Sequence, residues 1–211
     1  MKTKICGLRE KENIAAISGL KPDFLGFIFY EKSPRYVGKD FSVEAFSILP
    51  SGVEKVGVFV NENVENVTAI CRKFGFGFAQ LHGDESPAFC QELAQNDIKI
   101  IKAFPIDGSF DFSVTEAYAG TCSYFLFDTK VEGFGGSGKS FDWSILEQYT
   151  GSTPFLLSGG LGLENITQSM EIQHPMLAGY DLNSKLETSP GVKDYEKVKT
   201  ILNTIRKNAI I

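Results

Sequence analysis

Two residues far apart in this chain, Cys6 and Asp128, could transfer protons; Cys6 ends a short strand-like run, and Asp128 ends an apolar one. A thiolate at Cys6, beside Gly7, could act as a general base or as a nucleophile. Burial at Asp128 would keep a carboxyl protonated and available as a general acid. Such an acid and base suit proton-transfer chemistry on a sugar. A packed core cysteine and a helix-capping aspartate are the structural alternatives, and for Cys6 the residues alone favour that alternative.

A glycine-rich segment, Ser158-Gly-Gly-Leu-Gly162, indicates a phosphate site. Gly159 and Gly160 have no side chains, so backbone N–H groups there could approach an anion closely. The N-terminus of a following helix would add a favourable partial charge. Tight turns without any ligand are the competing explanation for these glycines.

Arg35 and His82 also follow apolar runs and could contact a ligand. Arg35, in Ser33-Pro-Arg-Tyr, could hold a carboxylate through two parallel hydrogen bonds, or could be an ordinary solvated arginine. His82, in Gln80-Leu-His-Gly, could orient a ligand or only bond its own loop. We find neither the ligand spacing of a metal site nor a G-x-S-x-G nucleophile motif, and the four cysteines lie far apart.

One motif indicates a different function. Residues 133–140, GFGGSGKS, match the G-x-x-x-x-G-K-[ST] pattern of a nucleotide-binding P-loop, so a P-loop nucleotide hydrolase is the alternative reading. That loop requires a strand that ends at its first glycine and a helix that starts at Lys-Ser. Four residues instead separate Asp128 from Gly133, and the helix start signal is Asp142. We therefore expect an accidental match within a glycine-rich loop.

The elements that must position these residues follow from the apolar pattern. Eight short runs, several of them almost entirely apolar, are typical of strands covered on both faces in a parallel sheet. One strand and one helix in about 26 residues fits a compact (β/α)8 barrel, an α/β fold, formed by a single domain over residues 1–211. A doubly wound sheet is the competing architecture. The runs are 2–6, 24–30, 56–60, 78–81, 98–104, 124–128, 155–158 and 177–181.

Helical patterns lie between the runs. Ser86 and Pro87 provide a cap residue and a proline for the first helical turn. The weakest candidate is 113–119, because its residues are poor helix formers and Gly120 follows. In a (β/α)8 barrel the loops after all eight strands meet at one face, where the active site is built. The other candidates are 10–18, 42–49, 64–74, 86–94, 143–149, 165–172 and 195–205.

Composition excludes several classes of protein. The 211 residues carry 21 Lys and Arg against 26 Asp and Glu, a net charge of −5, which argues against nucleic acid or an anionic membrane as partner. No apolar stretch approaches the length of a membrane span or of a signal peptide. We therefore expect a cytoplasmic protein with reduced cysteines, and a monomer, with a dimer as the alternative.

Short segments in order along residues 4–194 together resemble one family, the phosphoribosylanthranilate isomerases of tryptophan biosynthesis. Each segment alone is weak, but the set is highly specific. After the eighth run many members read Ser-Gly-Val-Glu, whereas this chain has Ser184-Lys-Leu-Glu187, so the phosphate geometry there is the least secure assignment. The segments are KICGL, LGFIF, SPRY, VGVFV, QLHGDE, FDT, GGSGK, FDW, LSGGL, DLNSKLE and PGVKD.

The resemblance implies a barrel that rearranges N-(5-phosphoribosyl)anthranilate to 1-(o-carboxyphenylamino)-1-deoxyribulose 5-phosphate without cofactor or metal. It makes Asp128 the general acid at the ribose ring oxygen and Cys6 the general base at C2′. It places the anthranilate carboxylate on Arg35, with His82 in the same pocket. The phosphate of this small-molecule phosphosugar would lie on four residues: Gly159, Gly160, Asn183 and Ser184.

Overall fold

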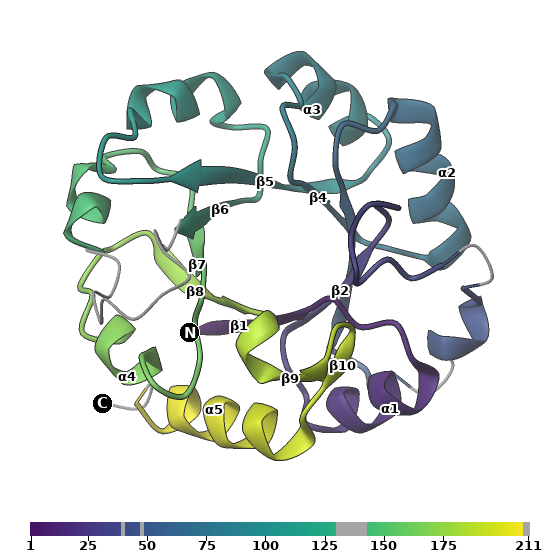
Figure 1. Ribbon diagram of the computed structural model, residues 1–211. Helices are drawn as coiled ribbons and strands as arrows, with labels where there is room; N and C mark the ends of the chain where they lie inside the picture. The colour runs from purple at the N-terminus through teal and green to yellow at the C-terminus, as the bar shows by residue number, and fades with distance from the viewer. Residues whose placement is uncertain (39–40, 47–48, 130–142, 209–211) are drawn as a thin grey trace.

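The computed structural model describes residues 1–38, 41–46, 49–129 and 143–208. Eight parallel strands close into a barrel in chain order, with β1 paired to β8 (Figure 1). The expected (β/α)8 fold is therefore confirmed, and a doubly wound sheet is excluded. The strands are β1 (Lys2–Cys6), β2 (Phe24–Ile28), β3 (Glu54–Phe59), β4 (Phe78–Leu81), β5 (Lys99–Ile106), β6 (Tyr124–Thr129), β7 (Phe155–Ser158) and β8 (Leu177–Leu182).

Helices surround the barrel, and several are shorter or tighter than the sequence pattern predicts (Figure 1). The segments expected as helices at 42–49, 113–119 and 143–149 contain 3₁₀ turns in their described residues, and the helix expected at 165–172 is reduced to four residues. The outer elements are α1 (Lys11–Gly19), η1 (Val43–Phe46), α2 (Val64–Phe74), α3 (Pro87–Ala94), η2 (Phe112–Tyr118), η3 (Trp143–Gln148), α4 (Ile166–Ser169) and α5 (Tyr195–Asn208).

Two of the regular helices, α2 and α3, begin at a capping side chain. The Asn63 side chain accepts a hydrogen bond from the N–H of Asn66 at the start of α2, and Ser86 does the same for Phe89 at α3. Gly75 ends α2 in the left-handed conformation at φ 62°. By contrast, η3 starts with Trp, Ser and Ile, which are only moderate helix formers. Tertiary packing therefore determines its geometry.

The interior of the barrel is filled in layers. Seven side chains form an apolar plug near the amino ends of the strands, and two of them, Phe24 and Phe78, meet edge to face with ring centroids 5.3 Å apart. Because successive residues of a strand point to opposite faces, the residue two positions later again points inward. Above Phe24, Phe78, Leu126 and Leu156 come Gly26, Gln80, Asp128 and Ser158. The plug thus supports a polar layer at the carboxyl ends of the strands.

A short hairpin follows the last barrel strand. After β8 the chain forms the turn η4 (Ser184–Leu186) and the antiparallel strands β9 (Glu187–Ser189) and β10 (Val192–Lys193). Thus the chain that follows β8 runs from Asn183 directly to Glu187 and Lys193, which reach back to the barrel mouth.

Candidate active site

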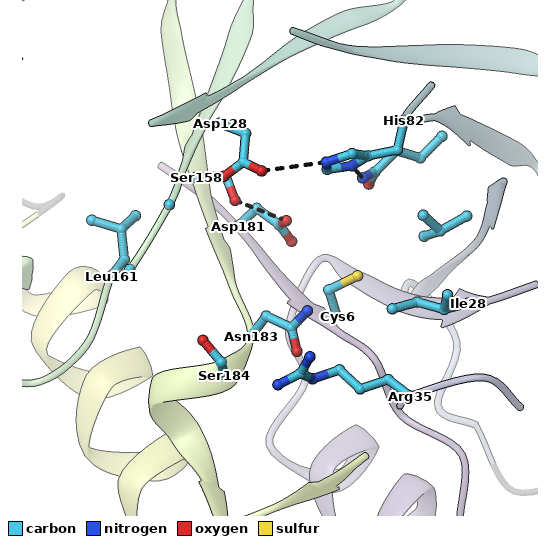
Figure 2. A pocket seen from close by; sticks show the side chains of 14 residues that line it. Cys6, Ile28, Arg35, His82, Asp128, Ser158, Leu161, Asp181, Asn183 and Ser184 are labelled. Carbon is cyan, nitrogen blue, oxygen red and sulfur yellow. Dashed lines mark hydrogen bonds and ion pairs between the residues drawn. The ribbon is translucent and has the colours of Figure 1, made fainter. Parts of the chain in front are cut away.

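One pocket at the carboxyl ends of the strands brings together every site residue expected from the sequence (Figure 2). Their positions in the chain span almost the whole barrel, from the end of β1 to the loop after β8. Because the strands are parallel and the sheet is closed, these ends meet around a single opening. The eight residues are Cys6, Arg35, His82, Asp128, Gly159, Gly160, Asn183 and Ser184.

Asp128 faces His82 across the mouth of the pocket. The Nε2 atom of His82 lies 3.3 Å from Oδ2 of Asp128, and each side chain is 35% exposed (Figure 2). The prediction from the apolar run 124–127 that Asp128 is buried is therefore wrong. Asp128 is the last inward-facing residue of its strand, so its carboxyl stands above the packed layers and a neighbouring imidazole replaces the apolar surroundings. His82 is the side chain that lies against this carboxyl.

Cys6 lies deeper in the same pocket, with only 3% of its surface exposed. Lys4, two residues earlier, points into the barrel with it and is completely buried. Burial raises the pKa of the Cys6 thiol, and the Lys4 ammonium only partly offsets this. Gly26 on β2 leaves the space for both side chains, since a Cβ there would lie 2.7 Å from Cys6 Sγ and 3.1 Å from Lys4 Nζ. A small residue at this point is what lets the thiol and the ammonium approach each other.

Asp181, which is not among the residues expected from the sequence, also lines the pocket. Its Oδ1 atom accepts a hydrogen bond from Lys4 Nζ at 2.8 Å, and its Oδ2 atom accepts one from Ser158 Oγ at 3.3 Å. Asp181 is 5% exposed, so its charge is compensated almost entirely by Lys4. The signal that could have found it is the alternation along β8, which points Asp181 inward two residues before Asn183.

Arg35 reaches the pocket from the loop after β2, already held by a carboxylate of the protein. Glu187 accepts hydrogen bonds from Arg35 Nε at 2.8 Å and from Nη2 at 2.7 Å. Glu187 also accepts one from the buried Lys193, whose Nζ donates to Asn183 Oδ1 at 2.7 Å. Burial alone would raise the pKa of Glu187, but the bonds from Arg35 and Lys193 outweigh it and leave the pKa below its usual range. The network ties the expected carboxylate site to the expected phosphate site.

The glycines after β7 adopt conformations that favour glycine. Gly159 has φ 100° and Gly160 has φ 63°. The Asn165 side chain fixes this loop, because it accepts from the N–H of Gly162 at 2.8 Å and donates to the carbonyl of Gly160 at 3.0 Å. The loop is thus a fixed backbone surface at the pocket rather than an open turn.

Lys185, the residue that departs from the common pattern, is directed to the surface. Its Nζ lies 3.1 Å from Oε1 of Glu164, and both side chains are more than half exposed. It is not among the residues that line the pocket, whereas its neighbour Ser184 is. The charge of Lys185 is therefore taken up outside the cavity.

A family model described as N-(5′-phosphoribosyl)anthranilate isomerase matches residues 3–204. The chain belongs to this isomerase family. The isomerase of Parabacteroides distasonis is 45% identical over 98% of this chain and 94% of that protein, and the one of Phocaeicola vulgatus is 44% identical over 97% of each. The solved isomerase of Thermotoga maritima is 33% identical, with a TM-score of 0.87 over 98% of this chain and 99% of that one.

Another solved member of the isomerase family was crystallised with reduced 1-(o-carboxyphenylamino)-1-deoxyribulose 5-phosphate. It is 30% identical to this chain, with a TM-score of 0.85 over 98% of this chain and 99% of that one. Family membership does not favour the alternative of a P-loop hydrolase. The segment 133–140 that suggested it lies outside the described residues. In the part of the chain that the structure describes, no helix is long and apolar enough to cross a membrane.

Proposed function

We propose that this protein converts N-(5′-phosphoribosyl)anthranilate to 1-(o-carboxyphenylamino)-1-deoxyribulose 5-phosphate in tryptophan biosynthesis, with Asp128 as general acid and Cys6 as general base. The observation that carries the proposal is that a carboxyl and a thiol, from β6 and β1, line one pocket whose rim also holds a glycine loop and an arginine. In Figure 2 the side chains of Cys6, Asp181 and Asp128 surround the same open space.

The reaction places one proton and removes another. Asp128 donates its proton to the ribose ring oxygen as the C1′–O bond breaks, and the electron pair of the anthranilate nitrogen forms an iminium. The Cys6 thiolate then takes the proton from C2′, and the electrons of that C–H bond form an enamine. Transfer of the hydroxyl proton at C2′ to C1′ completes the ketone. No electrons leave the substrate, and a placed side chain supports each proton shift, so the proposed route uses no cofactor and no metal.

The remaining residues position the substrate. The backbone at Gly159 and Gly160, with Asn183 and Ser184, would bind the phosphate. The sugar would then lie between this phosphate site and the carboxylate site at Arg35. Glu187 holds the Nε–Nη2 side of Arg35, so an anthranilate carboxylate would approach the guanidinium from its Nη1 end. His82 would line the pocket between the phosphate site and the carboxylate site at Arg35.

The test is turnover of the phosphoribosyl substrate, followed by the change in anthranilate fluorescence. We expect Cys6→Ala and Asp128→Asn each to lose turnover on the order of a hundred-fold or more while the thermal unfolding curve stays cooperative. Cys71→Ala, a buried cysteine on α2, and Asp97→Asn, an exposed aspartate, are matched controls that should keep turnover. Near-normal turnover in either of the first two variants would remove the acid–base assignment.

The quaternary state and location are separate proposals. One solved structure is described as monomers of the dimeric isomerase of Thermotoga maritima. For this chain we propose a monomer in the cytoplasm, binding a small phosphosugar and neither nucleic acid nor membrane. Light scattering of the purified protein distinguishes a mass near 23.2 kDa from twice that value.

A further inference from the structure

Gln80 is a buried amide that the proposed chemistry does not use. It lies on β4, two residues before His82, and only 1% of its surface is exposed. Its Nε2 atom lies 2.8 Å from Nδ1 of His82. Its Oε1 atom has no hydrogen-bond partner among the described residues. A buried polar group that makes a single contact, to an imidazole beside the proposed acid, calls for a functional explanation.

That contact determines which nitrogen of His82 carries the proton. An amide nitrogen can only donate, so Nδ1 of His82 must accept and therefore has no hydrogen. The proton of the neutral ring then lies on Nε2, the atom that faces Asp128 Oδ2 at 3.3 Å. Gln80, His82 and Asp128 thus form a chain of polar contacts: Gln80 donates to Nδ1 of His82, and Nε2 of the ring faces the carboxyl of Asp128.

The chain also determines where a second proton can go. A proton on Nδ1 would face the N–H group of Gln80, and two donors repel each other. The imidazolium is therefore disfavoured, and the additional proton can be accommodated on the carboxyl of Asp128.

Other charges around His82 are balanced in pairs. Lys102 and Glu85 form a buried ion pair with Nζ 3.2 Å from Oε2. Both bind the backbone beside His82, because Lys102 Nζ donates to the carbonyl of Gly83 and Glu85 accepts from its N–H. Asp84 is exposed on the same loop, and Asp181 on β8 is paired with Lys4. Among the described residues, Asp128 is the acidic group that faces the ring without a lysine or arginine paired to it.

We propose that Gln80 is a positioning residue that keeps His82 neutral, with its proton on Nε2, so that Asp128 rather than His82 holds the proton delivered to the substrate. This inference rests on the proposed function for its consequence in catalysis, but the state of the ring can be measured without any substrate.

Histidine-specific nitrogen NMR is the test, because the chain has only two histidines, His82 and His174. His174 is an internal reference: the N–H of Met176 donates to its Nδ1, and its Nε2 faces the carbonyl of Tyr149. We expect both rings to show a protonated Nε2 and an unprotonated Nδ1 at the pH of the assay. A protonated Nδ1 on His82 would overturn the proposal.

Two substitutions extend the test to catalysis. Gln80→Glu puts an acceptor at Nδ1, and we expect the His82 ring to become imidazolium and kcat to fall on the order of a hundred-fold with little change in KM. Gln80→Met, which keeps the volume, should allow both tautomers and cost roughly ten-fold. Gln91→Glu on the exposed side of α3 makes the same charge change and should alter neither ring nor rate.

The outcomes separate the two proposals. Unchanged His82 signals in both Gln80 variants would refute the role of Gln80. If Gln80→Glu fails to fold, Gln80→Met and the unmodified protein still decide the ring state. If the protein shows no isomerase turnover but the ring has the expected tautomer, the proposed function fails and the structural role of Gln80 stands.

Discussion

Lys4 and Asp181 form an ion pair in the centre of the barrel, with Nζ 2.8 Å from Oδ1 and both side chains almost completely buried. They are 177 residues apart in the chain and meet because β1 closes the sheet against β8 with these two residues in register. The pair lies between the apolar plug and the pocket. Each buried charge of the pair is therefore balanced by the other beneath the thiol of Cys6.

Replacing one member of the Lys4–Asp181 pair should destabilise the fold more than replacing both. We expect Lys4→Met or Asp181→Leu alone to lower the free energy of unfolding by about 3–5 kcal/mol, because each leaves a buried charge without its partner. The double variant Lys4→Met/Asp181→Leu should recover most of that loss. Urea unfolding of the three variants measures this, and a double variant as unstable as the two losses added together would contradict it.

The pH dependence of activity should reflect the buried thiol. Only the thiolate can accept a proton, and burial raises the pKa of Cys6, so kcat/KM should increase as the pH rises through that pKa. The inflection should lie above the usual thiol range. Alkylation of Cys6 by iodoacetamide, followed by mass spectrometry of its peptide, should show the same inflection. An alkylation rate that is already constant from neutral pH upward would show that Lys4 dominates over burial.

The space at Gly26 should matter more for activity than for the sheet. A Cβ in Gly26→Ala would meet Cys6 Sγ at 2.7 Å and push the thiol or the Lys4 ammonium away. We expect a loss of kcat of about ten-fold or more, since displacement of a reacting group by about 1 Å has large effects. Gly19→Ala at the end of α1 is the control, because nothing lies within 4 Å of its Cβ. Equal activity in the two variants would argue against a precise thiol position.

Glu187 should make stability depend on pH in a known direction. Its pKa is lowered in the folded protein by Arg35 and Lys193, so it stabilises the fold above the ordinary carboxyl range, and this contribution disappears as the pH falls through the lowered pKa. We expect Glu187→Gln to cost roughly 1–3 kcal/mol at neutral pH and little at strongly acidic pH. Thermal unfolding at several pH values measures the difference. A constant difference at every pH would contradict the prediction.

The sequence predicted the fold because the strand signal is local. Each of the eight apolar runs overlaps one strand of the barrel, and most of the polar residues that follow the runs line the pocket. The helix pattern was less reliable. At 42–49, 113–119 and 143–149 apolar spacing was present, but the described residues of these segments contain 3₁₀ turns, because spacing reports which side is buried and not how tightly the backbone is wound.

The sequence could not predict which side chains in the site would pair with each other. Arg35 and Glu187 are 152 residues apart, and neither shows in the sequence that the other will bind it. Gln80 and Lys4 occupy strands that look ordinary, and their function depends on pointing into a closed sheet.

Local chemistry in the chain, short strand-like runs followed by polar residues or glycine, predicted the strands and their polar ends, while the family resemblance favoured the barrel and a catalytic Cys6. Tertiary structure alone decided the partners: that Lys4 faces Asp181, that Glu187 holds Arg35, and that His82 rather than burial meets the carboxyl of Asp128. The physical reason is that strand formation depends on neighbours within a few residues, whereas ion pairs and proton positions depend on distances that only closure of the sheet sets.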